Sequence, residues 1–181
     1  MASAVMYAIR TISGNQPQIA RTIEKATQTF LLGVPVQVDQ SVGAIKEWDG
    51  TTVAAGISGI SKEAASNLTT TGVAKTLTFG SVQNETLAVN IPRGAPLNDG
   101  KIGYETSVFD SVFYGQVGPS QTTAATDVTK QYGMTKDSDN HWYVDKTNTS
   151  TPVVVVLELD TIDTTRGVHF AFLPSASQIL G

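Results

Sequence analysis

Two stretches near the C-terminus, Val153-Val-Val-Val-Leu-Glu-Leu159 and Gly167-Val-His-Phe-Ala-Phe-Leu173, decide the fold class. The first is a continuous, mainly β-branched run, which is typical of a strand covered on both faces. The second alternates apolar with other residues and stops at Pro174. Since only a short turn separates them, we expect the two strands to pair in antiparallel fashion.

The sequence before these strands contains further strand and turn signals. Tyr132–Thr135 and His141–Val144 flank a polar tip and predict a β-hairpin, and Ser111–Tyr114 predicts another strand. Asp49-Gly50 separates two β-like runs, 42–48 and 51–57, so a second hairpin is expected there.

The remaining segments complete a chain of short strands with glycine-rich connections. Strands are expected at 34–39, 73–79 and 87–91, a short helical turn at 62–67, and an exposed, mobile loop at 118–130. The predicted fold is mostly β: an antiparallel β-sandwich or barrel-like domain with little helix and an extended N-terminal arm.

The first thirty residues differ from the rest of the chain. They carry three basic residues and one acidic residue, a net charge of +2, whereas the whole chain carries −4, so residues 31–181 carry −6. Apolar residues are sparse here, and Gly14-Asn15-Gln16-Pro17 interrupts the segment. We expect either a frayed terminus or an arm at 1–30 that becomes ordered on a partner, next to a single β domain at 31–181.

The composition excludes several classes of protein and site. The chain has 181 residues and no cysteine, so disulfides, thiolate zinc sites and cysteine nucleophiles are excluded. No run of lysine or arginine suggests a nucleic-acid partner, and no segment approaches the roughly 20 apolar residues of a membrane span. We also expect no secretory signal peptide, because the start of the chain lacks a long apolar core.

Candidates for chemistry are few. His141 and His169 are the only histidines, and no nucleophile motif accompanies either one. Glu158 and Asp160 share one face of a strand, but a glycosidase needs two acids that converge from separate elements. The polar tip at 137–141 resembles only the first half of a calcium loop. We therefore predict no enzyme activity, no catalytic residue, no metal and no cofactor.

Several short strings together resemble the head-decoration, or cement, proteins of tailed bacteriophages. These strings occur within 30–181 and are Gly33-Val-Pro-Val-Gln-Val, Gly43-Ala-Ile-Lys-Glu-Trp-Asp-Gly50, Ala55-Gly-Ile-Ser58 with Glu63-Ala-Ala65, Tyr132-Gly-Met-Thr-Lys-Asp137, His141-Trp-Tyr-Val-Asp-Lys146 and Val168-His-Phe-Ala-Phe-Leu-Pro174. The resemblance implies a virion protein on the capsid exterior, made in the host bacterial cytoplasm. It further implies a homotrimer that clamps neighbouring major capsid subunits.

An arm can enlarge such an interface by adding a strand to a sheet edge of the major capsid protein. The residues expected to bind this partner are those of the arm: Ile9, Arg10, Ile12, Ile19, Arg21 and Ile23. Two alternatives stay open. One is a tail or fibre module, and the other is a carbohydrate-binding β module in which Trp48, Trp142 and Tyr143 stack on sugars, although packing in the core is the more common role of such rings.

Overall fold

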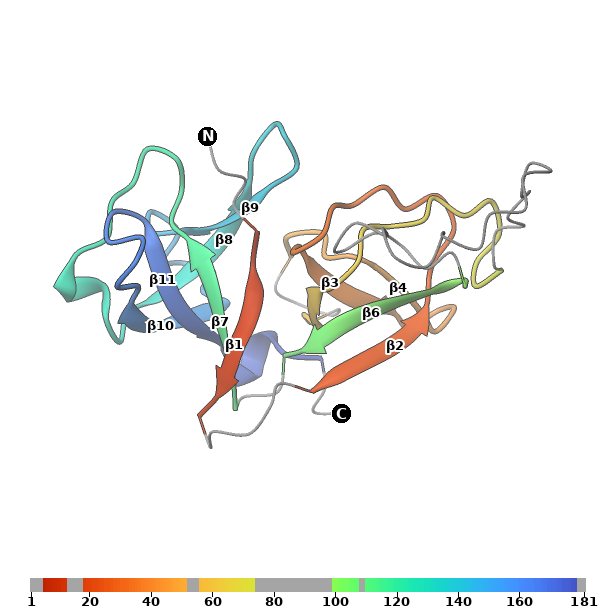
Figure 1. The fold of residues 1–181 in the computed structure, drawn as a ribbon, viewed down its shortest axis with the longest axis horizontal. Coiled ribbons are helices and arrows are strands. Elements are labelled where there is room, and N and C mark those ends of the chain that lie inside the picture. The colour runs from red at the N-terminus through yellow and green to blue at the C-terminus, as the bar shows by residue number, and fades with distance from the viewer. Residues whose placement is uncertain (1–4, 13–17, 52–55, 74–98, 108–109, 179–181) are drawn as a thin grey trace, which may run out of the picture.

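The computed structural model describes residues 5–12, 18–51, 56–73, 99–107 and 110–178. They form two antiparallel sheets, which Figure 1 shows side by side, with strand β1 (Tyr7–Thr11) at the edge of the six-stranded sheet on the left. The predicted mostly β, sandwich-like architecture with little helix is therefore confirmed. The only helices in the described ranges are two single 3₁₀ turns, η2 (Ala125–Asp127) and η3 (Pro174–Ala176).

The six-stranded sheet contains the C-terminal strands. Its order is β1 (Tyr7–Thr11), β7 (Ser111–Gln116), β11 (Gly167–Phe172), β10 (Val154–Leu159), β8 (Gln131–Lys136) and β9 (Trp142–Asp145). The expected pairing of β10 with β11 and the expected β8–β9 hairpin are both confirmed. In β10, Val154 and Val156 are buried while Val155 is half-buried, so one face contacts the core and the other is partly covered.

The five-stranded sheet contains the earlier strands. Its order is β2 (Ile19–Ile23), β6 (Lys101–Thr106), β5 (Gly59–Ser61), β3 (Pro35–Asp39) and β4 (Ala44–Glu47). An isolated parallel bridge between Glu24 and Ile45 joins the end of β2 to β4.

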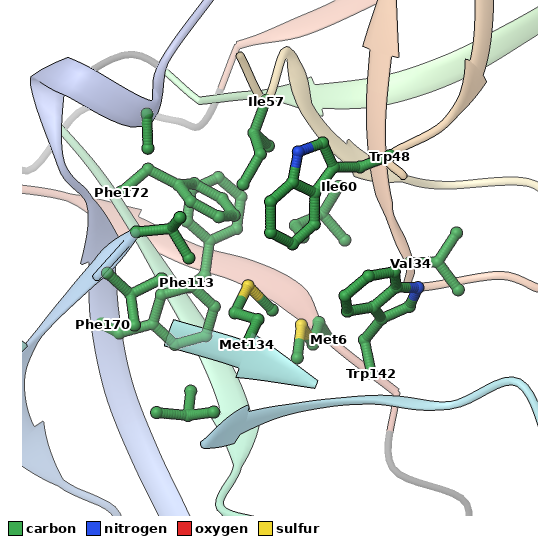
Figure 2. Close-up of a cluster of buried hydrophobic side chains, with 14 of the residues drawn as sticks. Met6, Val34, Trp48, Ile57, Ile60, Phe113, Met134, Trp142, Phe170 and Phe172 are labelled. Atoms are coloured by element: carbon green, nitrogen blue, oxygen red, sulfur yellow. The ribbon is translucent and has the colours of Figure 1, made fainter. Parts of the chain in front are cut away.

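Side chains from both sheets share one core (Figure 2). Trp48 follows β4 and Trp142 lies on β9, and their ring centroids are 5.0 Å apart. Phe113 on β7 and Phe170 on β11 extend the core along the inner face of the six-stranded sheet, where their rings stack. The C-terminal segment reinforces this connection beside η3, because Ile57 N–H donates to Ala176 O and Gln178 N–H donates to Ile57 O. Burial of large aromatic and aliphatic side chains therefore holds the two sheets together.

One local prediction is wrong, and a second lies largely outside the described residues. The second is the hairpin around Asp49-Gly50, since residues 52–55, which would pair with β4, are not described. Within the described residues β4 pairs with β3 through the Asp39–Gly43 turn, where the Asp39 carboxylate accepts hydrogen bonds from Ser41 and Gly43 has a φ of 63°. The Asp39 side-chain hydrogen bonds and the left-handed glycine stabilise this turn.

Residues 62–67, expected as a helical turn, form an irregular segment. Its backbone groups bond to other elements, as when Lys62 N–H donates to Gly103 O and Ala65 N–H to Phe30 O. The predicted strands at 73–79 and 87–91 lie outside the described residues, except for Val73.

The 118–130 loop is mostly exposed, but it is tied to its surroundings. Gln121 Nε2 donates to Asp145 Oδ1 over 2.9 Å, and Lys146 Nζ lies 2.7 Å from Asp127 Oδ2. Asp127 also accepts a hydrogen bond from Tyr132. These contacts to β8 and β9 fix the position of a segment whose sequence alone has no apolar pattern.

Candidate interaction surface

The first part of the predicted arm is extended, and it is an edge strand of the six-stranded sheet. β1 pairs with β7, and the register shifts between Ala8 and Arg10, so Ile9 lies at a bulge. Met6, just before the strand, is 1% exposed and belongs to the shared core, and its N–H donates to Gly33 O. Ala8 also packs against the core. The burial of Met6 and the packing of Ala8 therefore attach β1 to the shared core.

A buried carboxylate on the other sheet fixes the backbone of β1. Glu105, on β6, accepts a hydrogen bond from Ala8 N–H, and its Oε1 lies 2.9 Å from Lys62 Nζ. An ionised carboxylate is a strong acceptor for a backbone donor. Because Glu105 also pairs with Ile19 of β2, it connects the two halves of the predicted arm.

The second part of the arm, β2, is an edge strand of the five-stranded sheet and is held mainly by charge. Arg21 pairs with Glu63 and, over 2.9 Å, with Asp99. A Cβ at Gly103 would lie 3.0 Å from Glu63 Oε1 and 3.1 Å from Arg21 Nη1, so the glycine leaves room for this pair over β6. The pKa of Asp99 is lowered, because hydrogen bonds from Lys101 N–H and Arg21 outweigh the opposing effect of burial.

The outer edge of β2 is covered at one end. Lys25 N–H donates to Ile45 O, and Gly72 N–H donates to Glu24 O, so the segment after Ile23 has neighbours on both sides. At Ile19–Arg21, β6 is the only strand that pairs with β2 in the described part of the chain. The beginning of β2 therefore presents backbone groups on which another strand could add.

The six predicted partner-binding residues fall into two groups. Ile9 is 37% exposed and Ile12 and Ile19 are each 58% exposed, so these three can contact a partner. Arg10 and Arg21 are engaged in ion pairs with Glu158, Glu63 and Asp99, and Ile23 is half-buried.

The sequence reasoning missed one residue of this surface. Tyr7, whose side chain is 46% exposed, stacks on Tyr114 with the ring centroids 5.1 Å apart. The sequence offered one sign that Tyr7 could be exposed: it lies, like Ile9, in the N-terminal segment whose apolar residues are sparse.

Both histidines lie beside carboxylates. His169 lies between two acids: its Nδ1 is 2.7 Å from Glu158 Oε1, and its Nε2 is 3.4 Å from Asp160 Oδ1. A hydrolase histidine needs a nucleophile on one nitrogen and an orienting acid on the other. Here both ring nitrogens face carboxylates, so His169 lacks this arrangement.

The polar tip of the β8–β9 hairpin brings Asp137, Asp139 and His141 together, with potential ligand atoms within 4.8 Å of one another. The Asp137 carboxylate accepts hydrogen bonds from the backbone N–H groups of Asp139 and His141 and from the Tyr143 hydroxyl. These bonds close the turn and lower the pKa of Asp137 against the opposing effect of burial. The hydrogen bonds of the hairpin turn therefore explain why Asp137, Asp139 and His141 lie together.

The three aromatic residues considered for sugar stacking are buried. Trp48, Trp142 and Tyr143 are 3%, 5% and 6% exposed. Trp142 Nε1 donates to Glu47 and Trp48 Nε1 donates to Thr51 O, so each indole N–H has a partner within the protein. Trp48 and Trp142 belong to the shared core, whereas the Tyr143 ring lies beneath the Arg166 guanidinium, 5.3 Å from it. None of the three rings offers an exposed face to a glycan.

Searches of protein-family models, of curated proteins and of solved structures found no match to this chain. No helix in the described ranges has the length and hydropathy to cross a bilayer.

Proposed function

We propose that this protein is a structural component of a tailed-phage virion that binds the outer surface of the assembled capsid and stabilises it by clamping neighbouring major capsid subunits. The proposal begins from the resemblance of its sequence to head-decoration proteins, which also suggests a homotrimer. Among the features of the fold, the exposed surface of the first two strands supports it best.

The observation that carries the proposal is the concentration of exposed apolar side chains in one segment. Eight large hydrophobic side chains are exposed in the described part of the chain, and four of them, Tyr7, Ile9, Ile12 and Ile19, lie between residues 7 and 19. Grouped exposed apolar side chains mark interaction sites, whereas scattered ones are ordinary.

Two physical effects would act together at this surface. The isoleucines would lose water on docking, and the open start of β2 would add backbone hydrogen bonds to a sheet edge of a capsid subunit. A protein that binds the assembled shell and not free subunits stabilises the shell by its binding free energy.

The test is co-sedimentation of the full chain with undecorated, expanded capsid shells, with bound copies counted per capsid subunit. Deleting residues 2–25 would be a poor test, because it removes Met6 from the core. The informative variant is Ile12→Ser combined with Ile19→Ser. Val42→Ser is the matched control, since Val42 is 50% exposed in the β3–β4 turn.

We expect saturable binding at a simple ratio, a loss of at least roughly tenfold in affinity for the double variant, and no change for Val42→Ser. Absence of binding to intact shells would refute the proposal. Equal binding by the double variant would refute the assigned surface. Sedimentation equilibrium of the free protein tests the homotrimer separately.

A further inference from the structure

The outer face of the six-stranded sheet carries a continuous row of aromatic and charged side chains. The strand registers place Tyr7 opposite Tyr114, Tyr114 opposite His169, and His169 opposite Glu158. Directly paired residues project from the same face of a sheet. The row therefore crosses β1, β7, β11 and β10, the strands at the left of Figure 1.

One end of the row is an aromatic face. The rings of Tyr7 and Tyr114 stack with an interplanar angle of 28°, and Tyr7 is 46% exposed. One face of the Tyr7 ring is thus turned toward Tyr114, and solvent reaches the other side of the residue. An accessible tyrosine face attracts guanidinium and ammonium groups.

The other end of the row is a carboxylate with an unused oxygen. Glu158 Oε1 accepts hydrogen bonds from Arg10 Nη2 over 2.8 Å and from His169 Nδ1 over 2.7 Å. Within the described residues, Glu158 Oε2 accepts none, and the side chain is 46% exposed. Arg10 shows that a guanidinium fits against this carboxylate, and ion pairs as exposed as this one are weak enough to be exchanged.

The β10–β11 turn beside the row adds an apolar group and more negative charge. Asp163 Oδ2 accepts a hydrogen bond of 2.7 Å from Gln116, and Asp163 N–H donates to Asp160 Oδ2 over 2.7 Å. This fixed turn presents Ile162, which is 93% exposed. A preorganised turn loses little conformational entropy when a partner binds.

The charges around the row are unbalanced. Three acids, Glu158, Asp160 and Asp163, lie around the row. Glu158 pairs with Arg10 and Asp163 interacts electrostatically with Arg166, so the carboxylates outnumber the two guanidinium groups. A partner that complements this face must therefore be cationic.

We propose that this row binds a basic, extended segment of a partner protein, with one arginine on the exposed face of Tyr7, a second on Glu158, and an aliphatic contact to Ile162. The spacing defines the ligand. Tyr7 and Glu158 lie three strand spacings apart, about 14 Å, and side chains at positions i and i+4 of an extended segment lie about 13 Å apart. The row thus matches Arg-x-x-x-Arg. This inference shares Tyr7 with the exposed apolar segment but uses none of its isoleucines, so it stands without the proposed capsid surface.

The test is an NMR titration of the ¹⁵N-labelled full chain with the peptide acetyl-Arg-Gly-Ser-Gly-Arg-amide. We expect amide shifts confined to β1, β7, β10, β11 and the β10–β11 turn, and their loss in high salt. Glu158→Gln and Tyr7→Leu should each weaken binding by roughly threefold. Arg10→Ala should strengthen binding, because it removes the internal competitor for Glu158.

Matched controls separate this site from a general attraction to an acidic protein. Arg21→Ala changes the net charge as Arg10→Ala does, but on β2, and should leave peptide affinity unchanged. The same peptide with glutamate in place of both arginines should give no localised shifts.

Dispersed shifts over the whole surface, or equal effects of Arg10→Ala and Arg21→Ala, would overturn the proposal. Shifts of the row with a soluble oligosaccharide but not with the arginine peptide would assign the face to a glycan instead. Because no capsid is used, failure here is distinct from failure of the proposed capsid binding.

Discussion

The two edge strands β1 and β2 come from the same thirty residues, yet the protein holds them in different ways. β1 follows Met6, which is 1% exposed, and its Ala8 N–H bonds to the buried Glu105 carboxylate. In β2, the half-buried Ala20 is the one hydrophobic residue that packs against the described core, and Arg21 forms ion pairs with the partly exposed Glu63 and Asp99. Both strands pair along most of their length with one neighbour, β1 with a bulge at Ile9, so backbone pairing does not explain why β1 is held more firmly.

The difference shows what makes an edge strand part of a domain. A backbone hydrogen bond exchanged for one to water contributes little, whereas a buried side chain contributes about 2 kcal/mol or more. β1 is therefore expected to open only when the core is disturbed, and β2 is expected to open more readily. This makes the start of β2 the better candidate for a rearrangement on a partner.

The largest effect is expected from Met6→Ala. Removing this buried side chain should lower the free energy of unfolding by about 2–4 kcal/mol, because it leaves a cavity between the sheets. Chemical denaturation measures the loss. Ile19→Ala, at an exposed position of β2, is the control and should change stability by less than about 0.5 kcal/mol. Similar losses for both variants would remove the distinction between the strands.

A smaller effect is expected from Glu105→Ala. It leaves Ala8 N–H and Lys62 without their acceptor and should cost about 1.5–3 kcal/mol. Hydrogen exchange should then speed up at Ala8 and its neighbours in β1. Glu105→Gln keeps an acceptor oxygen and should preserve much of the protection at Ala8. Unchanged exchange at Ala8 in the alanine variant would show that Glu105 does not hold β1.

For β2, Arg21→Ala should cost about 1–2 kcal/mol. Among the described residues, none donates a hydrogen bond to the buried Glu63 Oε2. Losing Arg21 therefore leaves a carboxylate that is only 12% exposed without its ion pair. Adding Glu63→Gln should recover part of the loss, because it removes the uncompensated charge. Thermal denaturation of the wild type, the two single variants and the double variant measures this coupling. Strictly additive changes in the free energy of unfolding would contradict it.

The smallest effect concerns acid. The hydrogen bonds from His169 and then Arg10 hold the pKa of Glu158 below its usual 4.5. A carboxyl whose pKa is depressed on folding stabilises the protein above its unfolded pKa, and this contribution disappears as the pH falls through the folded value. The Glu158 ion pairs on the sheet should therefore weaken only below pH 4.5.

Carboxyl ¹³C NMR can follow this titration directly. In Arg10→Ala the pKa of Glu158 should rise but stay below 4.5, since His169 is the larger cause. Asp99 lies just before β6 and pairs with Arg21 of β2, which contributes to the lowering of its pKa. It is the matched group and should respond only to Arg21→Ala. A response of Asp99 to Arg10→Ala would mean that the two strands are electrostatically coupled.

Some elements could be predicted because their signal is local. The β8–β9 hairpin combines a polar tip with flanking β runs, and β10 and β11 are apolar runs joined by a short turn. The helical turn expected at 62–67 failed, because the backbone groups of this segment bond to other elements, as Lys62 N–H does to Gly103 O and Ala65 N–H does to Phe30 O. Those partners are distant in the sequence, so no local pattern reveals them.

The candidate surfaces were only partly predictable. The exposed Ile9, Ile12 and Ile19 follow from sparse apolar residues in a segment of distinct composition. Nothing in the spacing of Tyr7, Tyr114, Glu158 and His169 along the chain reveals that they form one row. Their proximity depends on a strand order, β1-β7-β11-β10, that connects the N-terminus to the C-terminus.

The sequence by itself determined the class of this protein: a mostly β chain with no cysteine chemistry and with short strands whose β-branched and aromatic residues require a shared core. Local turn geometry and side-chain periodicity act over a few residues, so they are written in the sequence. Only the tertiary structure decided that the N-terminal segment divides between the two sheets. That choice rests on long-range contacts, the burial of Met6 and the bond from Ala8 to Glu105, which exist only once both sheets are assembled.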